Sequence, residues 1–105
     1  MPIRLSRPAR RDLDDIRRYT LDTWGRTQWL KYYRGLVRAF EGVIVNPGSG
    51  RDRSRFVPGM GSVMYGKHFI FYAPTSPADD APVILRIVAQ HRTMRALVYY
   101  EDSGG

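Results

Sequence analysis

The stretch Pro82–Arg92, Pro-Val-Ile-Leu-Arg-Ile-Val-Ala-Gln-His-Arg, decides the fold of this chain because it is the longest run of β-type residues. Side chains along a strand alternate between two faces. One face is apolar throughout and consists of Val83, Leu85, Ile87 and Ala89. The other face is mixed and consists of Ile84, Arg86, Val88 and Gln90. Because the run starts apolar on both faces, it predicts a strand in the centre of a sheet.

The polar residues of the mixed face leave two interpretations open. Arg86 either faces solvent from a half-covered sheet, with its aliphatic stem on apolar surface, or contacts a partner. The sequence favours neither interpretation for Arg86. For Gln90, solvent exposure is the simpler one.

Two amphipathic helices are predicted ahead of this strand. Ser6 is suited to the N-cap of the first, with Pro8 in its first turn, and Gly25 ends it. Its predicted buried stripe is Ala9, Leu13, Ile16, Thr20 and Trp24. The second runs from Thr27, a possible cap, to Val45. Its apolar stripe is Trp29, Leu30, Tyr33, Leu36, Val37, Phe40, Val43 and Ile44. A tight turn joins the two into an antiparallel hairpin.

Two short strands are predicted between the helices and the long strand. Ser62–Tyr65 and His68–Ala73 form a hairpin around Gly66-Lys67, with Gly first as a type II′ turn prefers. In this register Val63 opposes Ile70 and Tyr65 opposes His68. Pro2–Leu5 is predicted to be an edge strand.

The fold class predicted from this order is α+β. An N-terminal strand precedes a two-helix antiparallel hairpin that packs on one face of a small antiparallel β-sheet. The 105 residues fit one domain, with residues 101–105 as a flexible tail.

Arginine dominates the charge of the chain. Lys and Arg number 17 against 10 Asp and Glu, a formal net charge of +7. Residues 1–57 hold 13 basic and 6 acidic residues, which accounts for the whole excess. Such a field attracts nucleic acid or an acidic protein. In the Gly-rich loop at 48–61, Arg51, Arg53 and Arg55 are suited to a phosphate backbone or an acidic tail, and a mobile basic loop without a partner explains them at least as well.

Several classes of function are excluded or disfavoured. Without cysteine the chain has neither disulfides nor thiolate metal sites. The loop at 48–61 lacks the Lys-Ser/Thr ending of a P-loop, which argues against nucleotide binding. Asp12, Asp14 and Asp15 form a charged solvent face more simply than a catalytic cluster. No cofactor or metal is predicted, and the absence of a signal leader or membrane span leads us to expect a cytoplasmic location.

An ordered set of short motifs resembles the ParE/RelE superfamily of toxins from bacterial toxin–antitoxin systems. The motifs are Leu5-Ser6 with Ala9, Asp12-Leu13 and Ile16; Trp24-Gly25 before Gln28; Tyr33 and Leu36; Asn46-Pro47-Gly48 with Gly50-Arg51; His68-Phe69-Ile70-Phe71-Tyr72; and Ile84-Leu85-Arg86-Ile87-Val88 followed by His91-Arg92. The resemblance covers about Leu5–Arg95, and the Trp-Gly helical hairpin favours the ParE branch.

The resemblance implies a toxin that arrests growth and stabilises plasmids. ParE-like toxins poison DNA gyrase by binding it, and RelE-like toxins cut mRNA on the ribosome. Both are neutralised by an antitoxin whose disordered, often acidic C-terminal segment folds onto the toxin. The partners predicted here are therefore a ParD-like antitoxin and DNA gyrase.

A RelE-type endoribonuclease is the alternative function. Metal-free RNA cleavage needs a general base, a general acid and cations for the developing charge. The resemblance would assign this chemistry to Arg86, His91, Arg92 and Tyr99. The nuclease pattern has a Tyr or His six residues after an Arg. Six residues after Arg92 the chain has Val98, and Tyr99 is off by one, which favours a non-enzymatic toxin. A plain nucleic-acid-binding module ranks last, because no reading motif is recognisable.

These interpretations assign two sets of site residues. The target-binding set is Arg86, Gln90, His91, Arg92 and Arg95. The antitoxin-binding set is Arg10, Leu13, Arg17, Arg18, Arg51 and Arg53.

Overall fold

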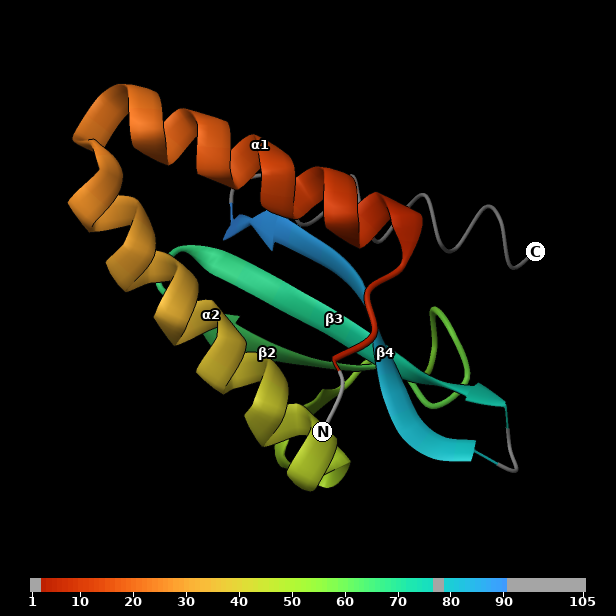
Figure 1. Cartoon of the computed structure of the whole chain (residues 1–105). Helices are drawn as coiled ribbons and strands as arrows, with labels where there is room; N and C mark the ends of the chain where they lie inside the picture. Colours follow the sequence, from red (N-terminus) through yellow and green to blue (C-terminus); the bar gives the residue numbers. More distant parts are fainter. Residues whose placement is uncertain (1–2, 77–78, 91–105) are drawn as a thin grey trace.

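The computed structural model describes residues 3–76 and 79–90, in which two helices lie on one side of a sheet (Figure 1). The helices are α1 (Arg7–Trp24) and α2 (Arg26–Val45), and a 3-10 turn, η1 (Pro47–Ser49), follows them. The strands are β1 (Arg51–Asp52), β2 (Gly61–Tyr65), β3 (His68–Ser76) and β4 (Asp79–Ala89). They form an antiparallel meander in the order β1-β2-β3-β4, which confirms the predicted α+β class.

The ends of the helices follow from local chemistry. The Ser6 hydroxyl caps α1 by accepting a hydrogen bond from the Ala9 N–H at 3.1 Å. Gly25 adopts a φ of 89°, which ends α1 and lets the chain reverse into α2. The predicted Thr27 cap is wrong, because α2 begins one residue earlier and Gly25 occupies its N-cap position without a side-chain hydrogen bond.

The main core lies between the helices and the sheet. Its buried residues are Ala9, Ile16, Trp29, Leu36, Phe40, Val43, Ile70, Tyr72, Ile84 and Ile87. Three predicted core residues are wrong, since Trp24, Leu30 and Tyr33 are 68%, 36% and 40% exposed. Trp24 ends α1 at the tip of the hairpin. Leu30 and Tyr33 lie beside the core-facing stripe of α2, which passes through Trp29, Leu36, Phe40 and Val43.

The β2–β3 hairpin forms as predicted. Val63 pairs with Ile70 and Tyr65 pairs with His68. Gly66 has a φ of 56°, and no residue other than glycine has a positive φ among those described, as a type II′ turn requires. The second position of the turn has a negative φ, so a residue with a side chain, Lys67, fits there without strain.

A bulge in β4 overturns the predicted division of its faces. Phe71 pairs with Arg86 but Tyr72 pairs with Ile84, so Leu85 is an extra residue on β4. The alternation shifts there: Ile84 and Ile87 both enter the main core. Leu85 packs against a second cluster on the opposite face of the sheet. The predicted all-apolar face of Val83, Leu85, Ile87 and Ala89 does not exist.

The central position predicted for this strand is also wrong for the described residues. In the sheet β3 has neighbours on both sides, whereas β4 is the last strand. Beyond β4 the described chain adds one parallel bridge, from Leu5 to Ile84. The predicted N-terminal strand is therefore reduced to a single bridging residue.

The N-terminal segment and α1 satisfy the outer backbone groups of β4 around the bulge. The Ser6 N–H donates to the Ile84 carbonyl at 2.9 Å, and the Ile84 N–H donates to the Arg4 carbonyl at 2.9 Å. The Ser6 hydroxyl donates to the Leu85 carbonyl at 2.7 Å. The Ile87 N–H donates to Asp12 Oδ2 at 2.9 Å. These bonds close a sheet edge that would otherwise expose unpaired groups.

The face of the sheet away from the helices has a smaller core of its own. Met60, Phe71, Ala73 and Val88 are buried there, and Phe56 and Val57 from the loop after β1 pack against them. This loop covers part of the face that the sequence left open. No helix in the part of the chain described here is both long and apolar enough to cross a membrane.

The Asp12 carboxylate predicts a clear stability effect. It accepts from Arg86 Nε at 2.7 Å and Nη2 at 3.0 Å in addition to the Ile87 N–H. Asp12→Ala removes the two-point ion pair with the partly buried Arg86 and the acceptor of the Ile87 N–H, so we expect a loss of about 2–3 kcal/mol. Urea unfolding measures it. The matched control is Asp14→Ala on the exposed face of α1, which should leave stability almost unchanged; equal losses in both would contradict this role.

Candidate binding cleft

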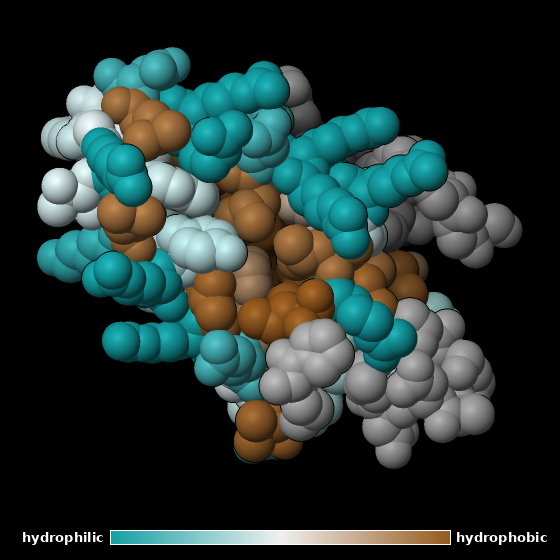
Figure 2. Space-filling model, viewed as in Figure 1, coloured by the Kyte–Doolittle hydropathy of each residue, from teal (hydrophilic) through white to brown (hydrophobic). Residues whose placement is uncertain are grey.

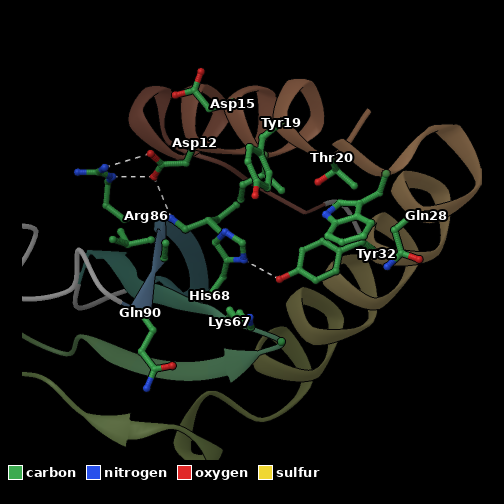
Figure 3. A pocket seen from close by; sticks show the side chains of 16 residues that line it. Asp12, Asp15, Tyr19, Thr20, Gln28, Tyr32, Lys67, His68, Arg86 and Gln90 are labelled. Carbon is green, nitrogen blue, oxygen red and sulfur yellow. Dashed lines mark hydrogen bonds and ion pairs between the residues drawn. The ribbon is translucent and has the colours of Figure 1, made fainter. Parts of the chain in front are cut away.

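A cleft of about 1210 Å³ opens where the helical hairpin reaches past the end of the sheet (Figure 3). Its walls come from the C-terminal half of α1, the start of α2, the β2–β3 turn and the end of β4. The described residues that line it are Asp12, Asp15, Ile16, Tyr19, Thr20, Trp24, Gln28, Tyr32, Gly66, Lys67, His68, Arg86, Ile87, Val88, Ala89 and Gln90.

Exposed aromatic side chains mark the helical wall of the cleft. Tyr19 is 65% exposed and Trp24 is 68% exposed. Figure 3 shows Tyr19 reaching from α1 toward the cleft, whereas Asp15 points away from it. Large amphipathic rings of this kind supply much of the energy at protein interfaces when a partner covers them.

Tyr32 joins α2 to the sheet at the floor of the cleft. The Tyr65 carbonyl can only accept, so the Tyr32 hydroxyl donates to it at 3.1 Å. The Tyr32 hydroxyl oxygen also forms a hydrogen bond with Nδ1 of His68 at 2.6 Å. The Tyr32 ring also meets the His68 ring edge-on, with centroids 5.6 Å apart. Burial, with a smaller contribution from Tyr65, raises the pKa of Tyr32 to about 12, so this phenol stays protonated at neutral pH.

Two close approaches depend on glycine. A Cβ on Gly66 would lie 2.8 Å from the Tyr32 hydroxyl oxygen, and a Cβ on Gly35 would overlap the Tyr65 ring. The Gln90 N–H donates to the Lys67 carbonyl at 2.8 Å, which ties the end of β4 to the turn. The rim formed by Lys67 and Gln90 is therefore held in a fixed position.

The ion pair of Arg86 and Asp12 forms the far wall of the cleft (Figure 3). The side chains are 27% and 14% exposed. The Asp12 carboxylate largely neutralises the Arg86 guanidinium. This wall of the cleft would therefore contact a partner through its shape more than through its charge. Among the described residues, no three carboxylate or imidazole groups come together as a metal site would require.

The structure brings together part of the predicted target-binding set. Arg86 and Gln90 both line the cleft. His91, Arg92, Arg95 and Tyr99, like the predicted tail at 101–105, lie outside the described residues. The prediction missed Tyr19, Gln28, Tyr32 and Lys67, and it placed Trp24 in the core. One signal in the sequence could have indicated that Trp24 is exposed. It is the last residue before Gly25, which ends the helix, and so lies at the tip of the hairpin, beyond the end of the sheet.

Part of the predicted antitoxin-binding set lines a second, shallower cavity of about 400 Å³, the interhelical groove. It lies between α1 and α2 and is lined by Arg10, Leu13, Asp14, Arg17, Trp29, Leu30 and Tyr33. Arg17 and Arg18 both pair with Asp14, at 2.9 and 3.0 Å. Figure 2 shows apolar surface between the helices bordered by hydrophilic side chains.

The rest of that set lies elsewhere. Arg51 is on β1 and Arg53 follows it, at the sheet edge opposite β4, whereas α1 packs on β4. The structure therefore separates these two arginines from Arg10, Leu13 and Arg17.

Comparison with a solved structure defines the class of the fold. A chain from the structure "Chromosomal ParDE TA system from P. aeruginosa" superposes with a TM-score of 0.65. The match covers 85% of this chain and 95% of that one at 23% sequence identity. The two-helix hairpin on an antiparallel sheet is thus the fold of a ParDE-type protein.

Sequence comparison then gives the family. Residues 3–94 match the family described as ParE toxin of type II toxin-antitoxin system, parDE. Toxin ParE1 of Caulobacter vibrioides is 34% identical over 95 residues, which cover 90% of this chain and 95% of that protein. The chain belongs to the ParE toxin family, as the resemblance predicted.

The raised pKa of Tyr32 predicts a stability loss at alkaline pH. Below about pH 10 the phenol is protonated in both folded and unfolded chains. Between about 10 and 12 the unfolded chain loses this proton while the folded one keeps it, so stability falls as pH rises. We expect the free energy of unfolding to drop more between pH 9 and 11.5 in the wild type than in Tyr32→Phe, measured by urea unfolding. Parallel pH profiles would show that Tyr32 is not protected.

Proposed function

We propose that this ParE-family chain inhibits DNA gyrase by binding it, and that the cleft is the contact surface. The observation that carries the proposal is the pair of aromatic side chains, Tyr19 and Trp24, held more than 60% exposed at the cleft. Contiguous exposed apolar surface on a small protein marks an interaction site. Arg86 and Gln90 line the same cleft, so the target-binding residues predicted from the sequence support this location.

The chemistry of the described cleft favours binding over catalysis. RNA cleavage without a metal needs a cation for the developing phosphorane charge and a group that exchanges protons near neutral pH. The guanidinium of Arg86 already faces the Asp12 carboxylate in a two-point ion pair. The pKa of about 12 keeps Tyr32 from acting as a base near neutral pH. These features support a toxin that acts by binding, and a translating extract is expected to keep its mRNA intact when the protein is added.

A cognate ParD-like antitoxin neutralises the toxin by covering the interhelical groove. Arg10 and Arg17 line the groove together with a single carboxylate, that of Asp14. Asp14 pairs with Arg17 and also with Arg18, which lies next to the groove along α1. Leu30 and Tyr33 add apolar surface on the other side. An amphipathic segment with acidic and apolar residues matches both features, as in helix-in-groove recognition. The assignment of Arg51 and Arg53 to the same partner stays a prediction.

Gyrase assays test the cleft. Purified toxin is expected to change supercoiling or trap cleaved DNA at micromolar concentration. The Tyr19→Ala/Trp24→Ala variant is expected to lose at least about tenfold in potency, because exposed aromatic anchors contribute most to an interface. Arg38→Gln, on the outer face of α2, is the control and keeps full potency. Unchanged supercoiling with the wild type removes the gyrase proposal; full potency in the double variant moves the contact away from the cleft.

Peptide binding tests the groove. Neutralising Arg10, Arg17 and Arg18 to Gln should weaken binding of the acidic antitoxin segment at low salt and flatten its salt dependence, because the charges speed and stabilise the encounter. Isothermal titration at two salt concentrations measures this. Neutralising Lys31, Arg34 and Arg38 instead removes the same charge from the outer face of α2 and should matter much less. Equal effects from both triple variants would mean that only the net charge counts.

A further inference from the structure

β1 and the loop after it carry a cluster of positive charge that the cleft and the groove do not use. Arg51, Arg53 and Arg55 alternate along five residues. The single acid among them, Asp52, turns to its own loop and accepts from the Ser54 N–H at 2.9 Å. Hydrogen bonds from Ser54 lower the pKa of Asp52. Within the described part of the chain, the three guanidinium groups make no ion pair with a carboxylate.

Arg53 is fixed in place without a counter-ion. Its Nε donates to the Ser62 hydroxyl at 3.1 Å, and Ser62 is only 4% exposed. This partner is neutral, so it orients the guanidinium but does not offset its charge. Partial burial and the nearby charge of Arg51 lower the pKa of Arg53. An incoming anion would offset the charges of Arg53 and Arg51, and a guanidinium fork with Nε already engaged presents its remaining N–H groups in a defined direction.

The backbone of this loop is also held firmly. The Arg53 N–H donates to the Met60 carbonyl at 2.8 Å, and the Phe56 N–H donates to the Arg53 carbonyl at 3.0 Å. On its other side, the buried Tyr72 hydroxyl donates to the Pro47 carbonyl at 2.6 Å and accepts from the Gly50 N–H at 3.1 Å. The arginines are therefore presented from a preorganised segment, which reduces the entropy lost on binding.

The position of the loop makes it a third surface. It follows β1, which lies at the sheet edge opposite β4 and pairs with the start of β2 at Gly61 and Ser62. The cleft lies at the other end of β2, beside Gly66. In Figure 1 the loop, drawn in green, lies at the end of the sheet away from the tip of the helical hairpin. A partner in the cleft thus leaves these arginines accessible.

We infer that Arg51, Arg53 and Arg55 form a phosphate-binding site for the sugar-phosphate backbone of a nucleic acid. An acidic peptide needs apolar surface to offset the cost of ordering, and the large exposed apolar side chains of the described chain lie elsewhere, on α1, α2 and β2. A polyanion needs none, because its affinity comes from released counterions. The site goes beyond the gyrase proposal and does not depend on it.

Fluorescence anisotropy tests the site with three probes: a short DNA duplex, a single-stranded RNA and a polyglutamate peptide. Arg51→Gln/Arg55→Gln removes two exposed charges and leaves the hydrogen-bonded Arg53 in place. Arg34→Gln/Arg38→Gln removes the same charge from the outer face of α2 and is the control. We expect the loop variant to lose about tenfold or more in nucleic-acid affinity, and its salt slope to fall by about 2 between about 50 and 200 mM salt.

Each outcome decides the proposal. A larger loss in the loop variant than in the control supports the site, and the preferred probe shows whether duplex DNA or RNA supplies the phosphates. Equal losses in both variants, or no binding of either nucleic acid by the wild type, overturn it. If the loop variant loses polyglutamate binding but keeps nucleic-acid binding, the proposal is also overturned, and the arginines instead bind an acidic protein. Gyrase inhibition measured with the same variants reports separately on the cleft.

Discussion

The contact of α1 with the bulged edge of β4 is the constraint on which the rest of the structure depends. The Ser6 hydroxyl caps α1 at Ala9 and also bonds to the Leu85 carbonyl of β4. The Asp12 carboxylate, in the N-terminal half of α1, bonds to Arg86 and to the Ile87 N–H, both on β4. A β-bulge leaves backbone groups out of the regular ladder, and a last strand exposes its outer groups as well. Because the segment before α1 and α1 itself supply partners for both, these bonds hold the helix in place on the sheet.

This fixed start determines where the other end of the hairpin goes. α1 has 18 residues, or about 27 Å at 1.5 Å per residue. With Ser6 and Asp12 anchored on β4, the far end of α1 extends past the β2–β3 turn (Figure 1). The turn is short because Gly66 and Lys67 reverse the chain at once, so no strand among the described residues extends under Tyr19 and Trp24. The cleft thus forms because the helical hairpin is longer than the strands beneath it. The hydrogen bond between Tyr32 and His68 closes its floor.

The sequence was informative where structure depends on neighbours along the chain. Gly66-Lys67 set the register of the hairpin, and Ser6 set the start of α1, since both act through local backbone geometry. It was uninformative where distant segments decide. The bulge at Leu85 needs Ser6 and Asp12, some 80 residues away, to satisfy it, so period-two alternation assigned the faces of β4 wrongly. The same limit applies to the cleft: Arg86 and Gln90 were found on the strand, but Tyr19 and Tyr32 required the relative placement of helix and turn.

The exposure of large apolar side chains indicates where this protein binds its partners more clearly than any single contact does. A domain of this size has few such side chains, and burying each is worth roughly 1.5–3 kcal/mol. Leaving Tyr19, Trp24, Leu30 and Tyr33 in solvent therefore forgoes stability that the chain could use. These residues are not scattered: two line the cleft and two line the interhelical groove, on opposite flanks of α1. The aromatic side chains of the cleft lie near the neutral Arg86–Asp12 ion pair, whereas those of the groove lie near the basic Arg10 and Arg17. The two surfaces therefore suit partners of different chemistry. This separation fits the two binding partners proposed above.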